Sequence, residues 1–286
     1  MTLFQLFIGF LLLLSWVGRP FLYKPAAKYF PPEISSLFTS SWLVVGLIIS
    51  YPLLGHLLVF NEKNVFTSPY ILISIYKGVT LFYLIALQQV INKKSTSSSV
   101  FLSFIALALG ALVNNLFFHE NLGLIKVACI VGFGVLGLLF LQKGDAKRLS
   151  KRDLIYFMVV AVIMASYTVS DHLAIPQVGW YAHLFVSSIA MFVVSAFHKA
   201  SKKDLKAILT NKTIIGAGVF YTVSEFFVIY ASINILPVSI VAVFLRLSVP
   251  VVMVVSAIKY KEQNLKNQLG FGLAAILLAL PIMLIK

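Results

Sequence analysis

Charged side chains are scarce in this sequence, and their scarcity excludes a soluble protein. They make up 11% of the 286 residues, whereas a soluble domain carries about 25%. Hydrophobic residues make up 60%, and the mean hydropathy is +0.98. The apolar residues form long unbroken runs rather than ten-residue alternation, which indicates helices and not a barrel. We therefore expect an all-α integral membrane protein.

Cysteine is nearly absent as well, because Cys129 is the only one. A single cysteine excludes an intramolecular disulfide, and its place in an apolar run leaves the redox compartment unreadable. The first apolar run, from Leu3, lacks a basic start and a small-residue cleavage site. We therefore expect no cleaved signal peptide.

Acidic residues are few, nine against 23 lysines and arginines, and the formal net charge is +14. In a soluble chain this charge would favour nucleic acid as a partner. Here the basic residues fall in short loops between apolar runs, where they set the orientation of a membrane protein. We expect no nucleic-acid partner.

Motifs for catalysis are also missing. The sequence has no metal-ligand spacing, no nucleophile elbow and no phosphate-binding loop, and the glycines of residues 132–137 follow no strand. We expect no enzyme, no cofactor and no metal site.

The sequence does contain ten apolar runs of membrane-spanning length. They are predicted at Leu3–Tyr23, Ser35–Leu58, Tyr70–Gln89, Ser98–Phe118, Leu122–Gln142, Leu154–His172, Tyr181–His198, Ile214–Leu236, Val238–Lys259 and Gln268–Ile285. No polar stretch between them is long enough for a soluble domain, so residues 1–286 are predicted to form a single membrane domain.

The two halves of the chain resemble each other. The matching segments are Ser35–Ser41 with Ala182–Ser188, Ile75-Tyr76 with Phe220-Tyr221, Ala86 with Ala231, Ser97 with Ser239, and Glu120 with Glu262. Residues of about 3–142 then correspond to those of about 154–285, with residues 143–153 as a basic connecting loop. Five spans in each half force opposite orientations, which is the inverted repeat of secondary transporters.

A family resemblance covers nearly the whole chain. It is carried by Pro31-Pro32, Ala86-Leu87, His119–Leu122, Ala165–Tyr167, Pro250 and Lys261-Glu262. In these residues the chain resembles the drug/metabolite transporter superfamily, in its ten-helix EamA-like branch. The resemblance implies a transporter of small metabolites or drugs that works by alternating access. The chain departs from that pattern at Ala108, where the first half would often carry the equivalent of Pro250, and at Arg246, which replaces an apolar residue.

Two ionisable residues lie deep in neighbouring spans. Glu225 is predicted about 16 Å, and Arg246 about 14 Å, from the connection between the spans, near the middle of a hydrocarbon slab about 30 Å thick. A charge at that depth costs on the order of 2.5–3.5 kcal/mol, so it persists when it pairs or lines a polar cavity. Both interpretations stay open: a structural Glu225–Arg246 ion pair, or a polar substrate site.

Further candidate substrate-binding residues lie on the helix faces near these two. They are Tyr221, Lys77, Tyr76, Thr80, Tyr83 and Ser239. Glu225 corresponds to Thr80 of the first half and Arg246 to Phe104, and such broken symmetry suits an asymmetric ligand. The alternative for Lys77 is that its long side chain reaches the membrane surface.

Asp171 and His172 form a second ionisable cluster, near the predicted end of the sixth span. Together with Glu225 they are candidates for proton coupling, since histidine titrates near physiological pH. The alternative is that the helix ends here and both side chains reach headgroup water. His183 is expected to be a buried, hydrogen-bonded histidine, whereas Arg19 and Lys24 are expected at the membrane interface.

The leading hypothesis is a secondary transporter of a small charged or zwitterionic, amino-acid-like metabolite, coupled to protons or working by exchange. Glu225 would bind a cationic group or a proton, and Arg246 would bind an anionic group with two donors. One alternative is an exporter of hydrophobic cations or drugs, and another is a non-transporting membrane interaction or lipid-handling protein. The expected partners are a small-molecule substrate, the lipid bilayer and coupling protons, for a monomer or a homodimer.

The loops between spans predict an orientation in the cell membrane, taken as a bacterial inner membrane. Of the 23 lysines and arginines, 18 follow the odd-numbered spans, on the side away from both termini. Because basic loops face the cytoplasm, both termini are predicted to be non-cytoplasmic.

Overall fold

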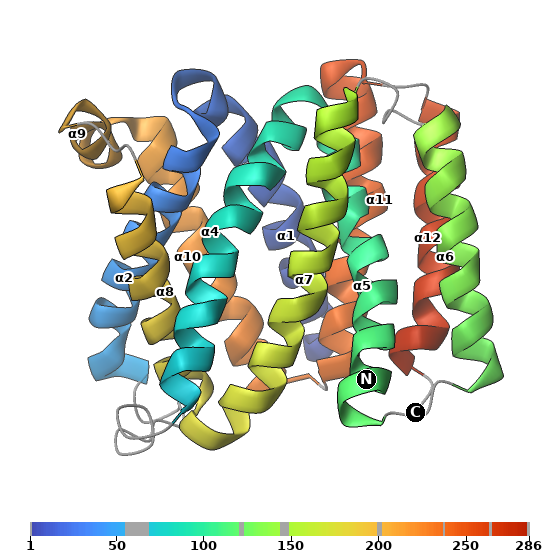
Figure 1. Cartoon of the computed structure of the whole chain (residues 1–286), viewed down its shortest axis with the longest axis horizontal. Coiled ribbons are helices and arrows are strands. Elements are labelled where there is room, and N and C mark those ends of the chain that lie inside the picture. The colour runs from blue at the N-terminus through green and yellow to red at the C-terminus, as the bar shows by residue number, and fades with distance from the viewer. Residues whose placement is uncertain are drawn as a thin grey trace.

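The computed structural model describes residues 2–54, 69–119, 123–143, 149–198, 202–236, 238–262 and 265–284, and nearly all of these residues lie in helices (Figure 1). The helices are α1 (Leu3–Tyr29), α2 (Pro32–Leu54), α4 (Tyr70–Lys94), α5 (Thr96–Phe118), α6 (Leu124–Lys143), α7 (Lys151–Val178), α8 (Trp180–Phe197), α9 (Lys202–Thr210), α10 (Lys212–Asn234), α11 (Val238–Tyr260) and α12 (Leu265–Leu284). Within the described residues, ten of them are long and apolar enough to cross a membrane. The all-α fold and the ten candidate spans are confirmed.

Helices α1 and α7 run six residues further than the hydropathy pattern predicts, and α4 runs five residues further, to Lys94. Helix α1 continues to Tyr29 instead of ending at Tyr23, and α7 continues to Val178 instead of ending at His172. Helix α7 stops only at Gly179, whose φ of 78° suits glycine and ends the helical path. The polar residues near the predicted ends of α1 and α7 therefore lie inside helices.

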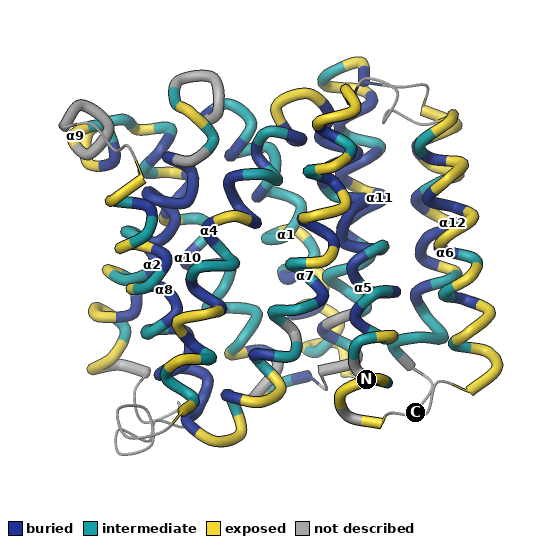
Figure 2. The backbone as a smooth tube through the Cα atoms, viewed as in Figure 1, coloured by how far each residue is buried: buried dark blue, intermediate teal, exposed yellow. Residues whose placement is uncertain are grey.

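The helices pack into a bundle whose inner faces are buried. Helix α4 packs on α7 and α8, α10 packs on α1 and α2, and α6 packs on α12 at one side of the molecule (Figure 1). Exposed segments follow the outer faces of α6 and α12 (Figure 2), where Leu138 and Leu277 are exposed. Exposed leucines on helices of this length suit a surface that meets lipid.

A glycine allows a close crossing of α4 and α8. A Cβ atom on Gly78 would lie 2.3 Å from the carbonyl oxygen of Ser187 and 2.6 Å from the Cβ of Ala190. Helices α4 and α8 therefore cross almost backbone to backbone, as small residues allow in membranes. The crossing holds the neighbouring Lys77 close to α8.

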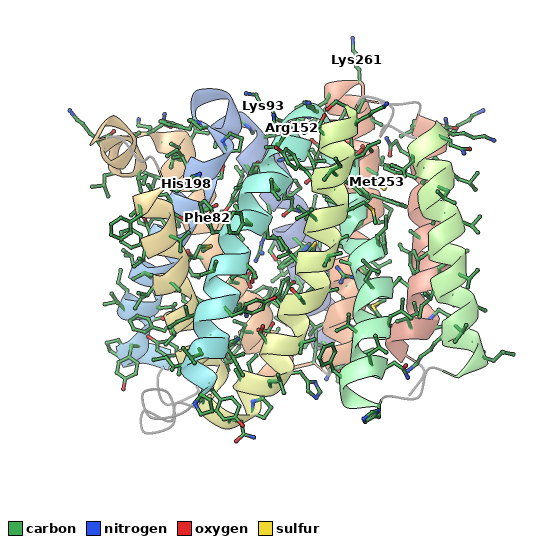
Figure 3. The ribbon with its side chains drawn as sticks, viewed as in Figure 1. Phe82, Lys93, Arg152, His198, Met253 and Lys261 are labelled. Atoms are coloured by element: carbon green, nitrogen blue, oxygen red, sulfur yellow. The ribbon has the colours of Figure 1, made fainter. Side chains whose placement is uncertain are left out.

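Both termini lie at one end of the bundle (Figure 1). Lys93, Arg152 and Lys261 lie at the opposite end (Figure 3), which we call the basic end. The short helix α9, from Lys202 to Thr210, also lies at the basic end (Figure 1).

Candidate functional site

A cavity of about 320 Å³ lies within the bundle. Eight helices line it, namely α1, α2, α4, α5, α7, α8, α10 and α11, and among the described residues none of the lining comes from α6, α9 or α12. Five acidic or basic side chains line the cavity: Arg19, Lys77, Asp171, Glu225 and Arg246. We call these five the central charged cluster.

Glu225 of α10 is held by Arg19 of α1. The Arg19 Nη1 donates to Oε1 of Glu225 over 2.8 Å, and the Arg19 Nε donates to the hydroxyl of Ser224 over 2.7 Å. The guanidinium also lies 3.6 Å from the ring centroid of Trp16 and 4.4 Å from that of Tyr221. Both partners are largely buried, with 10% and 20% of their side chains exposed. The ion pair and the two rings fix α1 against α10.

The expectation that Arg19 lies at the membrane interface is therefore wrong. Because α1 extends to Tyr29, Arg19 stands well inside the helix, and α10 supplies a carboxylate at the same depth. Lys24, one turn further along, is also largely buried, and it pairs with Glu262 over 2.5 Å. The sequence did hold a signal for Arg19, namely a permanent charge within an apolar run.

A second ion pair joins α4, α7 and α8. The Lys77 Nζ donates to Oδ1 of Asp171 over 2.5 Å, and the same oxygen lies 3.0 Å from Nε2 of His183. The other ring nitrogen of His183 lies 2.7 Å from the hydroxyl of Ser74. His183 is 1% exposed, so the expected buried, hydrogen-bonded histidine is confirmed. His172 is exposed, and it is His183 that is buried against Asp171.

Arg246 of α11 is the fifth member of the cluster and differs from the others. Among the described residues it alone of the five forms no ion pair within 4.0 Å. Its buried Nε has no hydrogen-bond partner among them, which is also true of Nη2 of Arg19. The Glu225–Arg246 ion pair, one of the two interpretations left open by the sequence, is therefore not formed. The helical rise gave the depths of the two residues. Depth does not say toward which neighbouring helix a side chain points, and Glu225 points toward α1.

The remaining candidate substrate-binding residues are divided between the cavity and its surroundings. Tyr221 lines the cavity beside Arg19. Thr80 donates to the carbonyl oxygen of Lys77 over 2.9 Å, and Tyr83 is 49% exposed; neither is among the described lining residues. The side chain of Ser239 lies outside the described residues.

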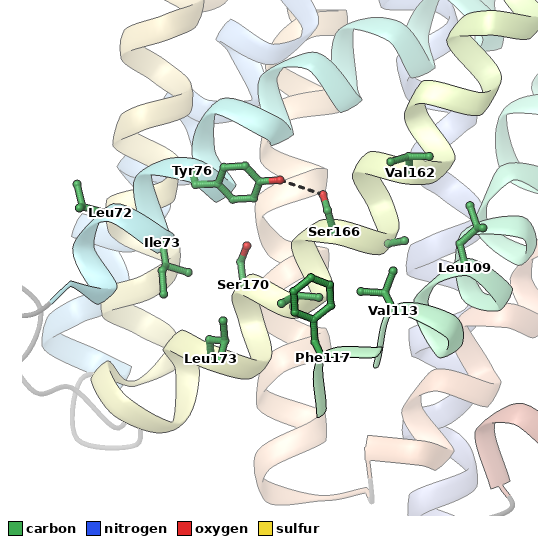
Figure 4. Close-up of a pocket in the computed structure, with 12 residues that line it drawn as sticks. Leu72, Ile73, Tyr76, Leu109, Val113, Phe117, Val162, Ser166, Ser170 and Leu173 are labelled. Atoms are coloured by element: carbon green, nitrogen blue, oxygen red, sulfur yellow. Dashed lines mark hydrogen bonds between the residues drawn. The ribbon is translucent and has the colours of Figure 1, made fainter. Parts of the chain in front are cut away.

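Tyr76 lines a second cavity, of about 500 Å³, between α4, α5 and α7 (Figure 4). Its hydroxyl donates to the hydroxyl of Ser166 over 3.3 Å. The other residues shown there are mainly apolar, as in Leu72 and Phe117 (Figure 4). Tyr76 therefore faces this outer groove, while its neighbour Lys77 faces the central cavity.

Several cavity residues were missed because their types are common in ordinary helices. They are Trp16, Tyr23, Gln88, Gln89, Asn92, Ser99, Ser103 and Tyr167. The amide and serine side chains extend the polar lining of the cavity from the central charged cluster toward Lys93 at the basic end (Figure 3). Helix α4 ends and α5 begins there. Only an unusual density of amide and hydroxyl groups at the junction of two spans could have pointed to them.

Glu262 accepts the hydrogen bonds of a separate network at the basic end. Its carboxylate accepts hydrogen bonds from the backbone N–H groups of Thr96 and Ser97, over 2.9 and 3.1 Å, and from the Nζ of Lys24 over 2.5 Å. Thr96 begins α5, so the carboxylate lies at the positive end of that helix dipole. Burial alone would raise the pKa of Glu262, but these hydrogen bonds outweigh it and lower the pKa below its usual 4.5.

Glu262→Gln is expected to lower the free energy of unfolding by about 1.5–3 kcal/mol at pH 7, the range for hydrogen bonds to a charged group. Because the folded pKa is lowered, the carboxylate stabilises the protein above pH 4.5 and loses that effect as the pH falls below it. Thermal denaturation of the purified protein between pH 7 and pH 3 measures both effects. As the pH falls, the thermal stability of wild type should decrease more steeply than that of the variant. An equally steep decrease in both proteins would contradict this role.

Neither a protein-family model nor a curated protein sequence matches the chain. The function is therefore inferred from the cavity and its charges.

Proposed function

We propose that the protein is a secondary transporter that moves a small charged or zwitterionic metabolite across a cell membrane by alternating access. The observation that carries this proposal is the central charged cluster, five ionisable side chains around a 320 Å³ cavity inside membrane-length helices. Ionisable groups inside membrane-spanning segments are expensive and typically mark a substrate or ion pathway. A cavity of this volume is the size of a small-molecule site.

The packing of the helices supports an inverted repeat. Exchanging the two halves of the chain replaces α4 by α10, α7 by α1 and α8 by α2. The contacts of α4 with α7 and α8 then become those of α10 with α1 and α2, which are also present. Four helices from each half line the cavity, as expected for a substrate site at a repeat interface. The resemblance to the EamA-like branch of the drug/metabolite transporter superfamily agrees with this and stays a prediction.

The ion pairs bear on the choice between substrates. Export of hydrophobic cations would need Glu225 as a counter-ion, but Arg19 already neutralises it. Asp171 remains the candidate for proton coupling, because it contacts both Lys77 and a histidine, His183. A membrane protein that does not transport is the alternative that the following experiment tests.

Exchange of metabolites by purified protein in liposomes tests the proposal directly. Vesicles loaded with one pool of small metabolites should take up the labelled members that the protein carries. Leu81→Trp, which fills the cavity, should abolish this exchange, whereas Leu277→Trp, on the lipid-facing surface, should preserve it. Folded wild-type protein that exchanges no metabolite of the pool would contradict transport.

We also propose that both termini are non-cytoplasmic, because the basic end lies opposite them (Figures 1 and 3). A C-terminal fusion to a reporter that is active only in the cytoplasm should give no signal. The same reporter inserted after Lys203, at the basic end, should be active. A bright C-terminal fusion would overturn this orientation.

A further inference from the structure

The central charged cluster is not electrically balanced. Arg19 is paired with Glu225 and Lys77 with Asp171, at 2.8 and 2.5 Å. The described lining residues then carry one excess basic group, and it is Arg246.

Arg246 is placed as a ligand-binding arginine would be. It lines the cavity, it is partly exposed there, and its buried Nε lacks a partner among the described residues. A buried donor without a partner is costly, and a guanidinium cannot escape the cost by losing its proton. An anion in the cavity would satisfy both the charge and the free donors.

The single excess positive charge of the lining indicates which class of anion would neutralise it. A guanidinium binds a carboxylate through two parallel hydrogen bonds, and one carboxylate cancels one charge. A phosphate monoester carries about −1.5 to −2 at pH 7 and would leave excess negative charge. A zwitterion would need a free acid for its ammonium group, but Glu225 and Asp171 are both occupied.

The rest of the lining suits an apolar body. Leu81, Leu84, Met164, Val249 and Val252 line the cavity together with aromatic rings. We propose that the cavity binds a small organic monocarboxylate, whose carboxylate Arg246 holds and whose body lies against these apolar side chains. This inference rests on the proposed transport function and narrows its substrate class.

A panel that varies only the charge tests the inference. One phenylethyl body is offered as 3-phenylpropionate, phenylalanine, 2-phenylethylamine and 2-phenylethyl phosphate, and an aliphatic series repeats the four charge types. Stabilisation of the purified protein against heat measures binding, and exchange in liposomes measures transport. We expect the monocarboxylates to stabilise wild type and Arg246→Met to bind them roughly 10- to 100-fold more weakly. Arg152→Met, the same change at an exposed arginine on α7, should bind them like wild type.

The outcomes separate the inference from the function on which it rests. Monocarboxylates that bind Arg246→Met as tightly as wild type overturn the inference. Stabilisation and exchange confined to phenylalanine, the amines or the phosphates also overturn it, yet support transport. Monocarboxylates that bind through Arg246 without being exchanged support the site and contradict transport. If no member of the panel binds or is exchanged, the inference fails, whereas transport fails only if no metabolite of the larger pool is exchanged.

Discussion

Glu225→Gln is expected to lower the free energy of unfolding by about 3–5 kcal/mol, the range for removing one partner of a buried ion pair. Arg19 would keep its charge, its bond to Ser224 and an acceptor in the new amide oxygen, but it would lose the opposite charge in a position that is 9% exposed. Denaturation of the purified protein, and the yield of folded protein, measure the loss. Arg19→Met should be costly too, because it leaves Glu225 buried alone.

The double variant Arg19→Met with Glu225→Gln provides the control. It removes both charges together, so it should recover most of the stability that each single variant loses. Double-variant stability no better than that of the worse single variant would contradict a simple structural pair. If Glu225→Gln unfolds like wild type, the ion pair contributes little to the fold.

Asp171→Asn is expected to have an effect of similar size, about 3–5 kcal/mol at pH 7, because Lys77 would be left buried without its carboxylate. The stability costs of Asp171→Asn and Glu225→Gln should differ at alkaline pH. An unpaired buried lysine can lose its proton, whereas an arginine cannot. Denaturation at pH 7 and pH 9 should therefore show a smaller cost for Asp171→Asn at the higher pH, and an unchanged cost for Glu225→Gln.

Lys77→Met combined with Asp171→Asn is the matched control for the second pair. Recovery of stability in this double variant, together with loss of any proton dependence of exchange, would mark Asp171 as a coupling group. Proton-dependent exchange that survives in a stable double variant would exclude Asp171 from coupling.

The ten spans were predictable because each is a long apolar run, and hydrophobicity over such a length is a property of the sequence alone. The depth of Glu225 and Arg246 was also within reach, since helical rise converts residue number into distance. Their partners were not, because pairing depends on the rotation of each helix and on which helices become neighbours. Glu225 meets Arg19, which lies 206 residues away in the chain.

The end of α7 shows a limit of predicting helix ends from hydropathy. Asp171 and His172 interrupt an apolar run, and hydropathy alone placed the helix end there. The structure continues the helix to Val178, because Lys77 and His183 supply Asp171 with polar partners inside the bundle. Gly179 was the better stop signal in the sequence, as glycine commonly follows the last turn of a helix.

The unbalanced Arg246 also has a consequence for the membrane voltage. A step that carries the empty cavity's single positive charge across the membrane is worth up to about 2.3 kcal/mol per 100 mV. With a monocarboxylate bound, the charges cancel and the same step is independent of voltage. In the proposed transport cycle the electric field would therefore act on the empty protein alone, and it would set how fast the empty cavity returns to the first side of the membrane.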